Sequence, residues 1–132
     1  MIVVDASVLA NIVGDDTKVG DAARARLASC TAAAVPDLAD VEAVAVLRKR
    51  WLAGDITARR FKAAVDDLVA LPIVRYPTSP LMHRAYELRA NVTAYGATYV
   101  ALAEGLTWTL LTADGRRARA PAVRCHVEIF TG

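Results

Sequence analysis

The sequence lacks the features that mark several common protein classes. It has only two cysteines, Cys30 and Cys125, which lie far apart and match no metal-binding spacing. We expect two free thiols in a reducing compartment, with a disulfide as the alternative. The longest stretch without a charged residue, 90–103, is well short of the ~20 apolar residues that a membrane span needs. Met1 leads directly into a short apolar run that ends at Asp5, so we expect no signal peptide and a cytoplasmic protein.

Motifs for nucleotide binding and phosphotransfer are also absent. The chain contains no Gly-x-Gly-x-x-Gly and no Walker loop, which weighs against a Rossmann or P-loop function. A phosphatase of the haloacid-dehalogenase type would need a second aspartate two residues after Asp5, where Ser7 stands. A receiver domain would need paired acids before its phosphorylated aspartate and a late lysine, but no lysine follows Lys62.

The composition describes a domain with abundant apolar residues and little net charge. At 132 residues the chain is long enough for one domain with a sizeable core, and we expect that domain to span residues 1–132. Apolar residues make up 55% of it and the mean hydropathy is +0.32. These values suggest that a partner covers some apolar surface. The formal charge of +2 is compatible with a nucleic-acid partner without arguing for one.

Apolar runs of strand length alternate with segments of helical periodicity. We expect strands at 2–5, 32–35, 71–76, 107–112 and 125–130, and longer helices at 17–29, 38–53, 57–70, 80–91 and 94–105. Short helices are expected at 7–13 and after Asp114. The helix over 38–53 should carry an apolar stripe of Leu38, Val41, Ala45 and Leu52, with Val44 beside it. The helix over 94–105 should end at Gly105. This alternation predicts an α/β fold with a mostly parallel sheet covered on both faces.

Two of the apolar runs end near an aspartate, Asp5 after the first and Asp114 after the run that begins at Trp108. The carboxyl ends of parallel strands form the ligand crevice of such sheets, so we expect the two carboxylates to share a site. Glu42, in the first turns of a helix, is a third candidate. Taken singly, each acid has a structural explanation: Asp5 in a turn, Asp114 as a helix cap, and Glu42 favouring the helix dipole.

Carboxylates gathered in one site raise one another's pKa, so a site that keeps them ionised normally holds a cation. Oxygen ligands favour a hard cation such as Mg²⁺, which suits chemistry on phosphate. Ser7 and Thr112 lie beside the acids in the sequence. Their hydroxyls could orient a metal-bound water or could simply cap the local backbone.

Four segments together resemble the PIN-domain ribonucleases, and most closely the VapC toxins of prokaryotic toxin–antitoxin pairs. The resemblance covers essentially the whole chain. Its most specific part is Thr93 to Glu104 followed by Leu-Thr-Ala-Asp. The segments are Asp5-Ala-Ser-Val-Leu, Pro36-Asp-Leu-Ala-Asp-Val-Glu42, the run from Arg89 to Glu104, and Leu111-Thr-Ala-Asp114.

The resemblance implies a three-layer α/β/α sandwich with a mostly parallel central sheet. It also implies an endoribonuclease that depends on Mg²⁺ or Mn²⁺, cleaves structured RNA such as tRNA or ribosomal RNA, forms a homodimer and is silenced by a cognate VapB-type antitoxin. Asp5, Glu42 and Asp114 match the acidic positions of the family. Three arginines that follow Asp114 are candidates for holding RNA phosphates, with a solvated helix face as the alternative: Arg116, Arg117 and Arg119.

The chain departs from the family at Gly96, where the family carries an aspartate that serves as a metal ligand. Glycine inside a helix costs ~1 kcal/mol relative to alanine, and the neighbouring sequence gives no reason for it. The chain is either a degenerate toxin or one changed at this position so that a toxic protein can be expressed. We expect weakened metal binding and impaired cleavage. The alternative is a non-catalytic PIN-like module that binds antitoxin or RNA without cleaving.

Overall fold

A five-stranded parallel sheet forms the centre of the computed structural model, which describes all residues from 1 to 132. Its strand order is β3-β2-β1-β4-β5, and all four neighbouring pairs are parallel. This confirms the predicted parallel α/β fold. The strands are β1 (Ile2–Val4), β2 (Ala33–Pro36), β3 (Val74–Tyr76), β4 (Thr109–Thr112) and β5 (Val127–Ile129).

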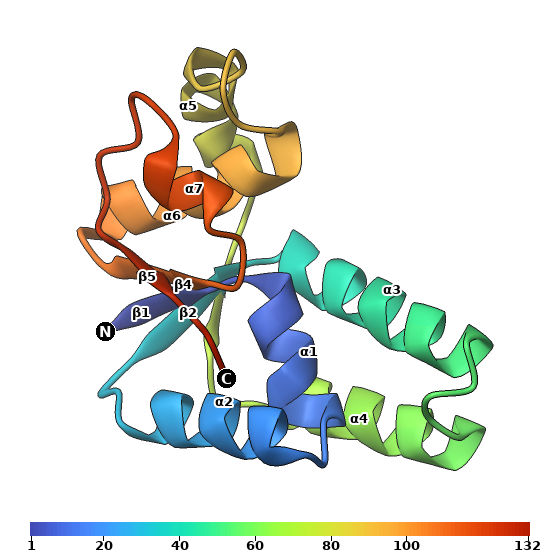
Figure 1. Cartoon of the computed structure of the whole chain (residues 1–132). Coiled ribbons are helices and arrows are strands. Elements are labelled where there is room, and N and C mark those ends of the chain that lie inside the picture. Colours follow the sequence, from blue (N-terminus) through green and yellow to red (C-terminus); the bar gives the residue numbers. More distant parts are fainter.

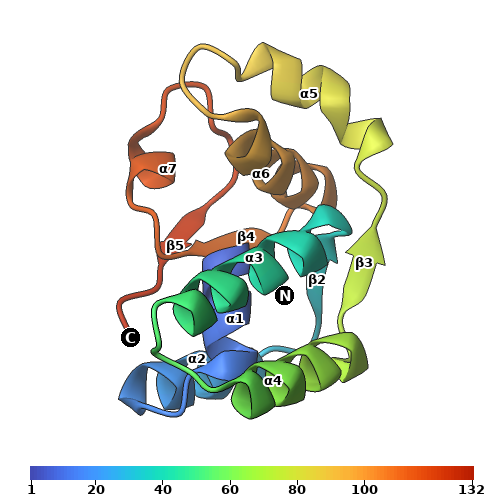
Figure 2. The ribbon, with the colours of Figure 1, turned by 90° about the vertical axis from the view of Figure 1, so that its right-hand side faces the viewer.

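Helices cover both faces of the sheet, as expected for a three-layer sandwich. On one face α1 packs against α2, α3 and α4, and on the other α5 packs against α6, which lies over β1, β2 and β4. Figure 1 shows α6 and α7 above the sheet and α1, α2 and α4 below it, and Figure 2 shows the same layers from the side. The helices are α1 (Ala6–Gly14), α2 (Lys18–Ala28), α3 (Leu38–Leu52), α4 (Ala58–Ala70), α5 (Met82–Glu87), α6 (Ala94–Leu106) and α7 (Arg116–Arg119).

The core consists of one cluster of 27 buried residues. The strand β1 is at its centre, and Ile2, Val3 and Val4 are each no more than 1% exposed. A strand covered by helices on both faces has no solvent side, which is why its sequence is continuously apolar rather than alternating. Each such side chain stabilises the fold by about 1.5–3 kcal/mol relative to full exposure.

Side-chain caps fix the starts of several helices where the sequence predicted them. The hydroxyl of Thr57 accepts a hydrogen bond from the amide of Arg60 at 3.1 Å, and that of Thr93 accepts one from the amide of Gly96 at 3.2 Å. Such a cap satisfies an amide that has no partner within the helix and is worth about 1 kcal/mol. The cap at Thr93 therefore fixes the start of α6, the helix that carries Gly96.

The structure corrects the predicted buried face of α3. Its buried residues are Ala39, Ala43 and Leu47, whereas Val41 is 73% exposed and Leu52 is 60% exposed. Of the predicted stripe, Val41, Ala45 and Leu52 are exposed, whereas Leu38 is half-buried and packs against the core. The buried residues instead recur every four positions, and two small alanines on this face allow α3 to approach α1 closely.

The structure also corrects three predicted element boundaries. The helix predicted over 80–91 is a 3₁₀ turn (Ser79–Leu81) followed by α5, which ends at Glu87 with the buried Leu88 as its C-cap. Gly105 does not end α6, which continues to Leu106 and ends with Thr107 in the left-handed region (φ 59°). Only three residues of 71–76 form β3.

Two further observations bear on the sequence predictions. Both cysteines are free thiols, as expected. No helix in the structure combines the length and the apolar character that crossing a lipid bilayer requires.

Candidate active site

The order of the strands brings the three predicted acids to one end of the sheet. Asp5 follows β1, Asp114 lies two residues beyond β4, and Glu42 lies on α3 just after β2. Because β1 is paired with both β2 and β4, the carboxyl ends of these strands are adjacent. They surround an open cavity of about 400 Å³ lined by Asp5, Ala6, Ser7, Glu42, Ala45, Val46, Asp114 and Arg117.

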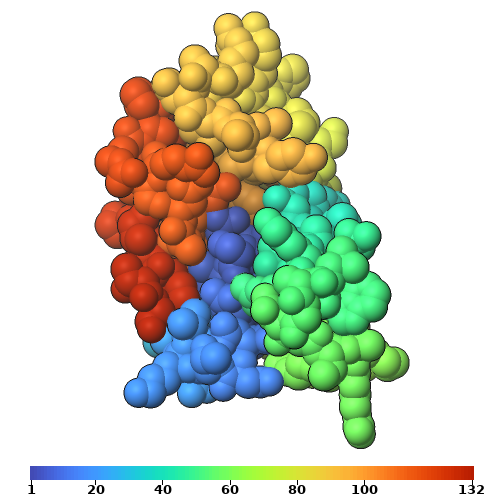
Figure 3. All heavy atoms as spheres, turned by 45° about the vertical axis from the view of Figure 1, so that its right-hand side comes forward, coloured from blue at the N-terminus to red at the C-terminus, as the bar shows by residue number.

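Figure 3 shows this place from outside. The first residues of α1, in blue, lie at the bottom of a depression between the orange segment that carries α7 and the teal start of α3. Residues 5, 42 and 114 therefore meet at one surface although they are distant in the sequence.

Asp5 serves both the fold and the site, through different oxygens. Its Oδ1 accepts a hydrogen bond from the amide of Ala6 at 2.7 Å, so that the side chain caps α1. Its Oδ2 accepts hydrogen bonds from the hydroxyl of Thr112 at 2.5 Å and from the guanidinium of Arg117. Asp5 is only 5% exposed, and a buried carboxylate of this kind is stable only when it is paired or hydrogen-bonded.

Asp114 is held by Arg116 in a forked ion pair. The Nε and Nη2 atoms of Arg116 donate to its carboxylate at 3.0 and 2.7 Å, and the backbone amide of Arg116 donates to Oδ1 at 3.0 Å. These bonds, led by the one from the Arg116 side chain, lower the pKa of Asp114 below its usual range. The amide of Asp114 donates to the Thr112 hydroxyl at 3.0 Å, which links it to Asp5.

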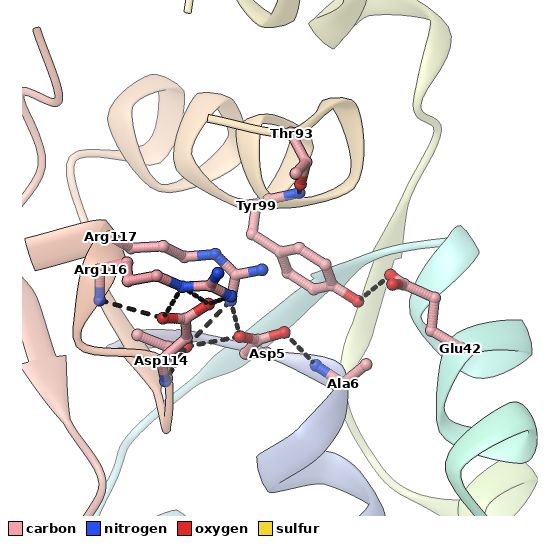
Figure 4. A network of polar contacts seen from close by, with 10 residues as sticks. Asp5, Ala6, Glu42, Thr93, Tyr99, Asp114, Arg116 and Arg117 are labelled. Atoms are coloured by element: carbon pink, nitrogen blue, oxygen red, sulfur yellow. Dashed lines mark hydrogen bonds and ion pairs between the residues drawn. The ribbon is translucent and has the colours of Figure 1, made fainter. Parts of the chain in front are cut away.

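Glu42 is bound by a residue that sequence reasoning did not assign to the site. The buried hydroxyl of Tyr99 donates to its Oε1 at 2.7 Å (Figure 4). Burial, together with this bond to a carboxylate, raises the pKa of Tyr99, which stays protonated. One signal in the sequence could have identified Tyr99. It lies three residues after Gly96 on α6 and therefore on the same helix face as the position where the family has its aspartate.

Arg117 points into the site, and its side chain is only 15% exposed. Its Nη1 donates to Asp5 and, at 3.0 Å, to the Thr112 hydroxyl. Its guanidinium carbon also lies 5.9 Å from the centre of the Tyr99 ring, within the range of a cation–π contact. Figure 4 shows the guanidinium beside the carboxylates of Asp5 and Asp114, while Glu42 lies beyond the Tyr99 ring. Burial lowers the pKa of Arg117, but a guanidinium starts so high that it stays charged.

Gly96 faces Arg117 from the first turn of α6. A Cβ atom at this position would lie 2.8 Å from Nε of Arg117 and 3.1 Å from its Nη2. A side chain at position 96 and Arg117 in its observed place are therefore mutually exclusive without movement of one of them. The structure thus gives Gly96 a local reason that the neighbouring sequence does not reveal.

The remaining predicted residues lie around these contacts. Ser7 lines the cavity, and its side chain forms no hydrogen bond with the protein. Thr112 is fully buried and connects Asp5, Asp114 and Arg117. Arg116 is 86% exposed and Arg119 is also exposed, so these two arginines of α7 face solvent while Arg117 faces inward.

The site as it is folded does not fit a divalent cation. Its oxygen donors are of the right kind, yet no group of three or more acidic, histidine or cysteine side chains lies close enough together to hold one metal ion. Arginines already pair with two of the three carboxylates, and only Glu42 has no cationic partner. A divalent ion bound through Asp5 would have to compete with a guanidinium that is already hydrogen-bonded there.

Comparisons with known proteins relate the chain to one family. Residues 2–123 match the PIN domain family. The chain is 43% identical to ribonuclease VapC1 of Mycobacterium tuberculosis over 95 residues, 71% of each protein. It is 36% identical to ribonuclease VapC12 of the same organism over 129 residues, 98% of each protein.

A solved structure extends the comparison to the fold. A chain of FitAcB from Neisseria gonorrhoeae superimposes with a TM-score of 0.65 over 96% of both chains. The sequences of the two chains are only 16% identical, so this match supports the arrangement of sheet and helices and nothing about the chemistry of the site.

Proposed function

The chain belongs to the PIN-domain family, and within it to the VapC ribonucleases, and from this membership we propose that it is the toxin of a type II toxin–antitoxin pair that acts on RNA as an endoribonuclease. The observation that carries the proposal is the meeting of Asp5, Glu42 and Asp114 at one open cavity. Acidic side chains at the carboxyl ends of adjacent parallel strands are suited to phosphodiester chemistry rather than to an apolar ligand. We propose structured RNA, such as tRNA or ribosomal RNA, as the substrate.

The cofactor that we propose for cleavage is Mg²⁺ or Mn²⁺. The three carboxylates would be its protein ligands only after Arg117 has left Asp5, and the cation would then supply an activated water and positive charge beside the phosphate. In the folded site Arg117 forms an ion pair with Asp5, and Gly96 supplies no carboxylate. We therefore expect this chain to cleave RNA far more slowly than a form with a free Asp5 and an acid at position 96.

The proposed partners follow from the surface of the chain and from its family. Arg116 and Arg119, which flank the site on the solvent side of α7, are proposed to hold RNA phosphates. Exposed apolar residues such as Val41, Leu52 and Tyr95 are available for contact with a VapB-type antitoxin and a second copy of the chain. We propose that the protein acts as a homodimer in the cytoplasm, where its RNA substrate and antitoxin occur.

A second candidate function is a PIN-like module that binds antitoxin or RNA without cleaving. The observation that favours it is the charge of the site, where arginines neutralise Asp5 and Asp114. Such a module would keep the surfaces that bind its partners, because these do not depend on a free carboxylate at the bottom of the cavity.

Cleavage of total cellular RNA distinguishes these two functions. The unchanged chain, the Gly96→Asp variant and the Gly96→Asp/Arg117→Met double variant would each be incubated with RNA in Mg²⁺ or in EDTA. We expect defined fragments from the double variant in Mg²⁺, far fewer from the unchanged chain, and none in EDTA.

A matched control carries Asp5→Asn in addition to the two substitutions. It should stop cleavage, which would exclude a contaminating nuclease. If the double variant binds Mn²⁺ but produces no fragments from any RNA, endonuclease activity is ruled out and the binding module is favoured.

A further inference from the structure

The contacts of Arg117 go beyond those of a surface arginine near a nuclease site. Its guanidinium is enclosed by the Asp5 carboxylate, the Thr112 hydroxyl, the Tyr99 ring and the backbone of Gly96. The second arginine of α7 that pairs with an acid, Arg116, is 86% exposed, whereas Arg117 is 15% exposed. The structure therefore builds a specific place for one positive charge next to Asp5.

We propose that Arg117 is the resident cation of this site: it takes the place on Asp5 that a divalent ion would need, and Gly96 is the residue that makes room for it. The proposal concerns the same site as the proposed function and relies on that function for the expectation that a cation belongs there. It goes further by making positions 96 and 117 a coupled pair and by predicting a site that is formed without metal.

Sterics and charge point to this coupling independently. A side chain at position 96 would begin 2.8 Å from Nε of Arg117, so even alanine requires movement there. An aspartate at position 96 would also find a guanidinium within reach and would form an ion pair with it. Restoring the family's aspartate by itself therefore supplies a partner for Arg117 rather than a ligand for a metal.

The hydrogen bonds of Asp5 also favour Arg117 over a divalent ion at this site. Asp5 is the most buried of the three acids, and its Oδ2 already accepts two hydrogen bonds. No buried side-chain polar atom in the structure lacks a hydrogen-bond partner. The network is thus complete with Arg117 in place, and a divalent ion would have to displace a guanidinium held by hydrogen bonds.

The test is Mn²⁺ binding, which requires no RNA and no activity. Four proteins are compared by isothermal titration and by the Mn²⁺-dependent rise in melting temperature: the unchanged chain, Gly96→Asp, Arg117→Met and the double variant. Methionine keeps much of the apolar stem of the arginine and removes its charge. Binding to the folded form stabilises it by an amount that depends on the ratio of ligand concentration to Kd.

We expect the effect of Gly96→Asp to depend on which residue stands at position 117. With Arg117 present the substitution should change Mn²⁺ affinity little. In the Arg117→Met background the same substitution should raise affinity on the order of 100-fold, because a carboxylate then meets the ion without a competing cation. The proposal is overturned if Gly96→Asp raises affinity equally in both backgrounds, or if the unchanged chain binds Mn²⁺ as tightly as Arg117→Met.

Arg59→Met is the matched control. It removes the same charge from the exposed surface of α4, and the side chain of Arg59 forms no ion pair and no hydrogen bond. It should leave Mn²⁺ binding as weak as in the unchanged chain. An increase equal to that of Arg117→Met would reduce the effect to net charge and contradict the proposal.

A measurement on the unchanged chain covers the case in which Arg117→Met does not fold. Mn²⁺ broadens the amide NMR signals of residues near its binding site, so the signals of Ala6, Thr112 and Asp114 report on occupancy. We expect no selective broadening of these signals at millimolar Mn²⁺, and selective broadening would overturn the proposal. Because none of these readouts involves RNA, the inference can fail while cleavage succeeds, or hold while cleavage fails.

Discussion

The two ends of the parallel sheet carry cavities of opposite character. At the carboxyl ends a cavity of about 400 Å³ is lined by three acids and an arginine. At the amino ends of β2 and β3 a larger one, about 590 Å³, has fourteen lining residues, of which ten are hydrophobic, including Ile12, Leu27 and Ile73. The larger cavity has the less reactive lining, so strand direction rather than cavity size indicates where chemistry takes place.

A single helix connects the two ends. α1 begins at the Asp5 cap, beside the acids, and its last turns place Ile12 and Val13 against the apolar cavity. Substitutions at the two ends of α1 therefore test the difference between the acidic and the apolar ends of the sheet within one helix. Those near Asp5 should change both stability and the chemistry of the site, and those near Ile12 should change stability alone.

The largest effect is expected for Asp5→Ala. The substitution removes the cap of α1 and leaves Arg117 and Thr112 without their carboxylate partner. A buried charge without its partner costs about 3–5 kcal/mol, so we expect the free energy of unfolding to fall by about 4 kcal/mol. Urea denaturation followed by circular dichroism measures this change.

The control for that prediction is Asp5→Ala combined with Arg117→Met. Because the double variant buries no unpaired charge, it should lose less stability than the sum of the two single variants. Strictly additive losses would mean that Asp5 and Arg117 do not interact in solution.

A smaller loss is expected for Ile12→Ala at the other end of α1. Ile12 is 5% exposed, and truncation of a buried isoleucine costs about 3 kcal/mol through lost burial and a residual cavity. Urea denaturation gives the loss, and amide NMR spectra should show unchanged signals for Thr112 and Asp114. Shifted signals at these residues would show that the two ends of α1 are coupled, and would contradict the expectation that Ile12 affects stability alone.

The smallest effect is expected for Tyr99→Phe, at the carboxyl end of the sheet. The ring stays buried, and only the hydrogen bond to Glu42 is lost. A hydrogen bond to a charged group contributes about 1.5–3 kcal/mol, and because Glu42 is only half-buried we expect a loss near the lower end, about 1.5 kcal/mol. Urea denaturation measures it, and a loss below experimental error would mean that water replaces the hydroxyl at no cost.

Tyr99→Phe also tests how the stability of the fold depends on pH. The pKa of Tyr99 is raised by burial and by its bond to Glu42, whereas the unfolded chain releases that proton near pH ~10. The stabilisation is therefore complete below pH ~10 and is lost as pH rises above it. Above that pH the stability of the unchanged chain should fall more steeply than that of Tyr99→Phe, and equal slopes would contradict the raised pKa.

The sequence predicted most of the fold because the relevant signals are local. Apolar runs followed by Asp5 and Asp114 locate strand ends, and the threonine caps locate helix starts. It failed for the buried face of α3, since alanines every four positions carry a weaker hydrophobic signal than the exposed Val41 and Leu52. Which face is buried was decided by the close approach of α1, a contact between distant segments.

The candidate site also combines features that the sequence predicted with features that only folding brought together. Which acids lie at the carboxyl end of the sheet follows from the sequence, because strand direction and the alternation of strands and helices fix that edge. The bond from Tyr99 to Glu42, the inward turn of Arg117 to Asp5 and the position of Gly96 opposite it depend on how the chain folds. These three contacts join elements brought together by folding, and no spacing along the chain encodes the distance between two helices.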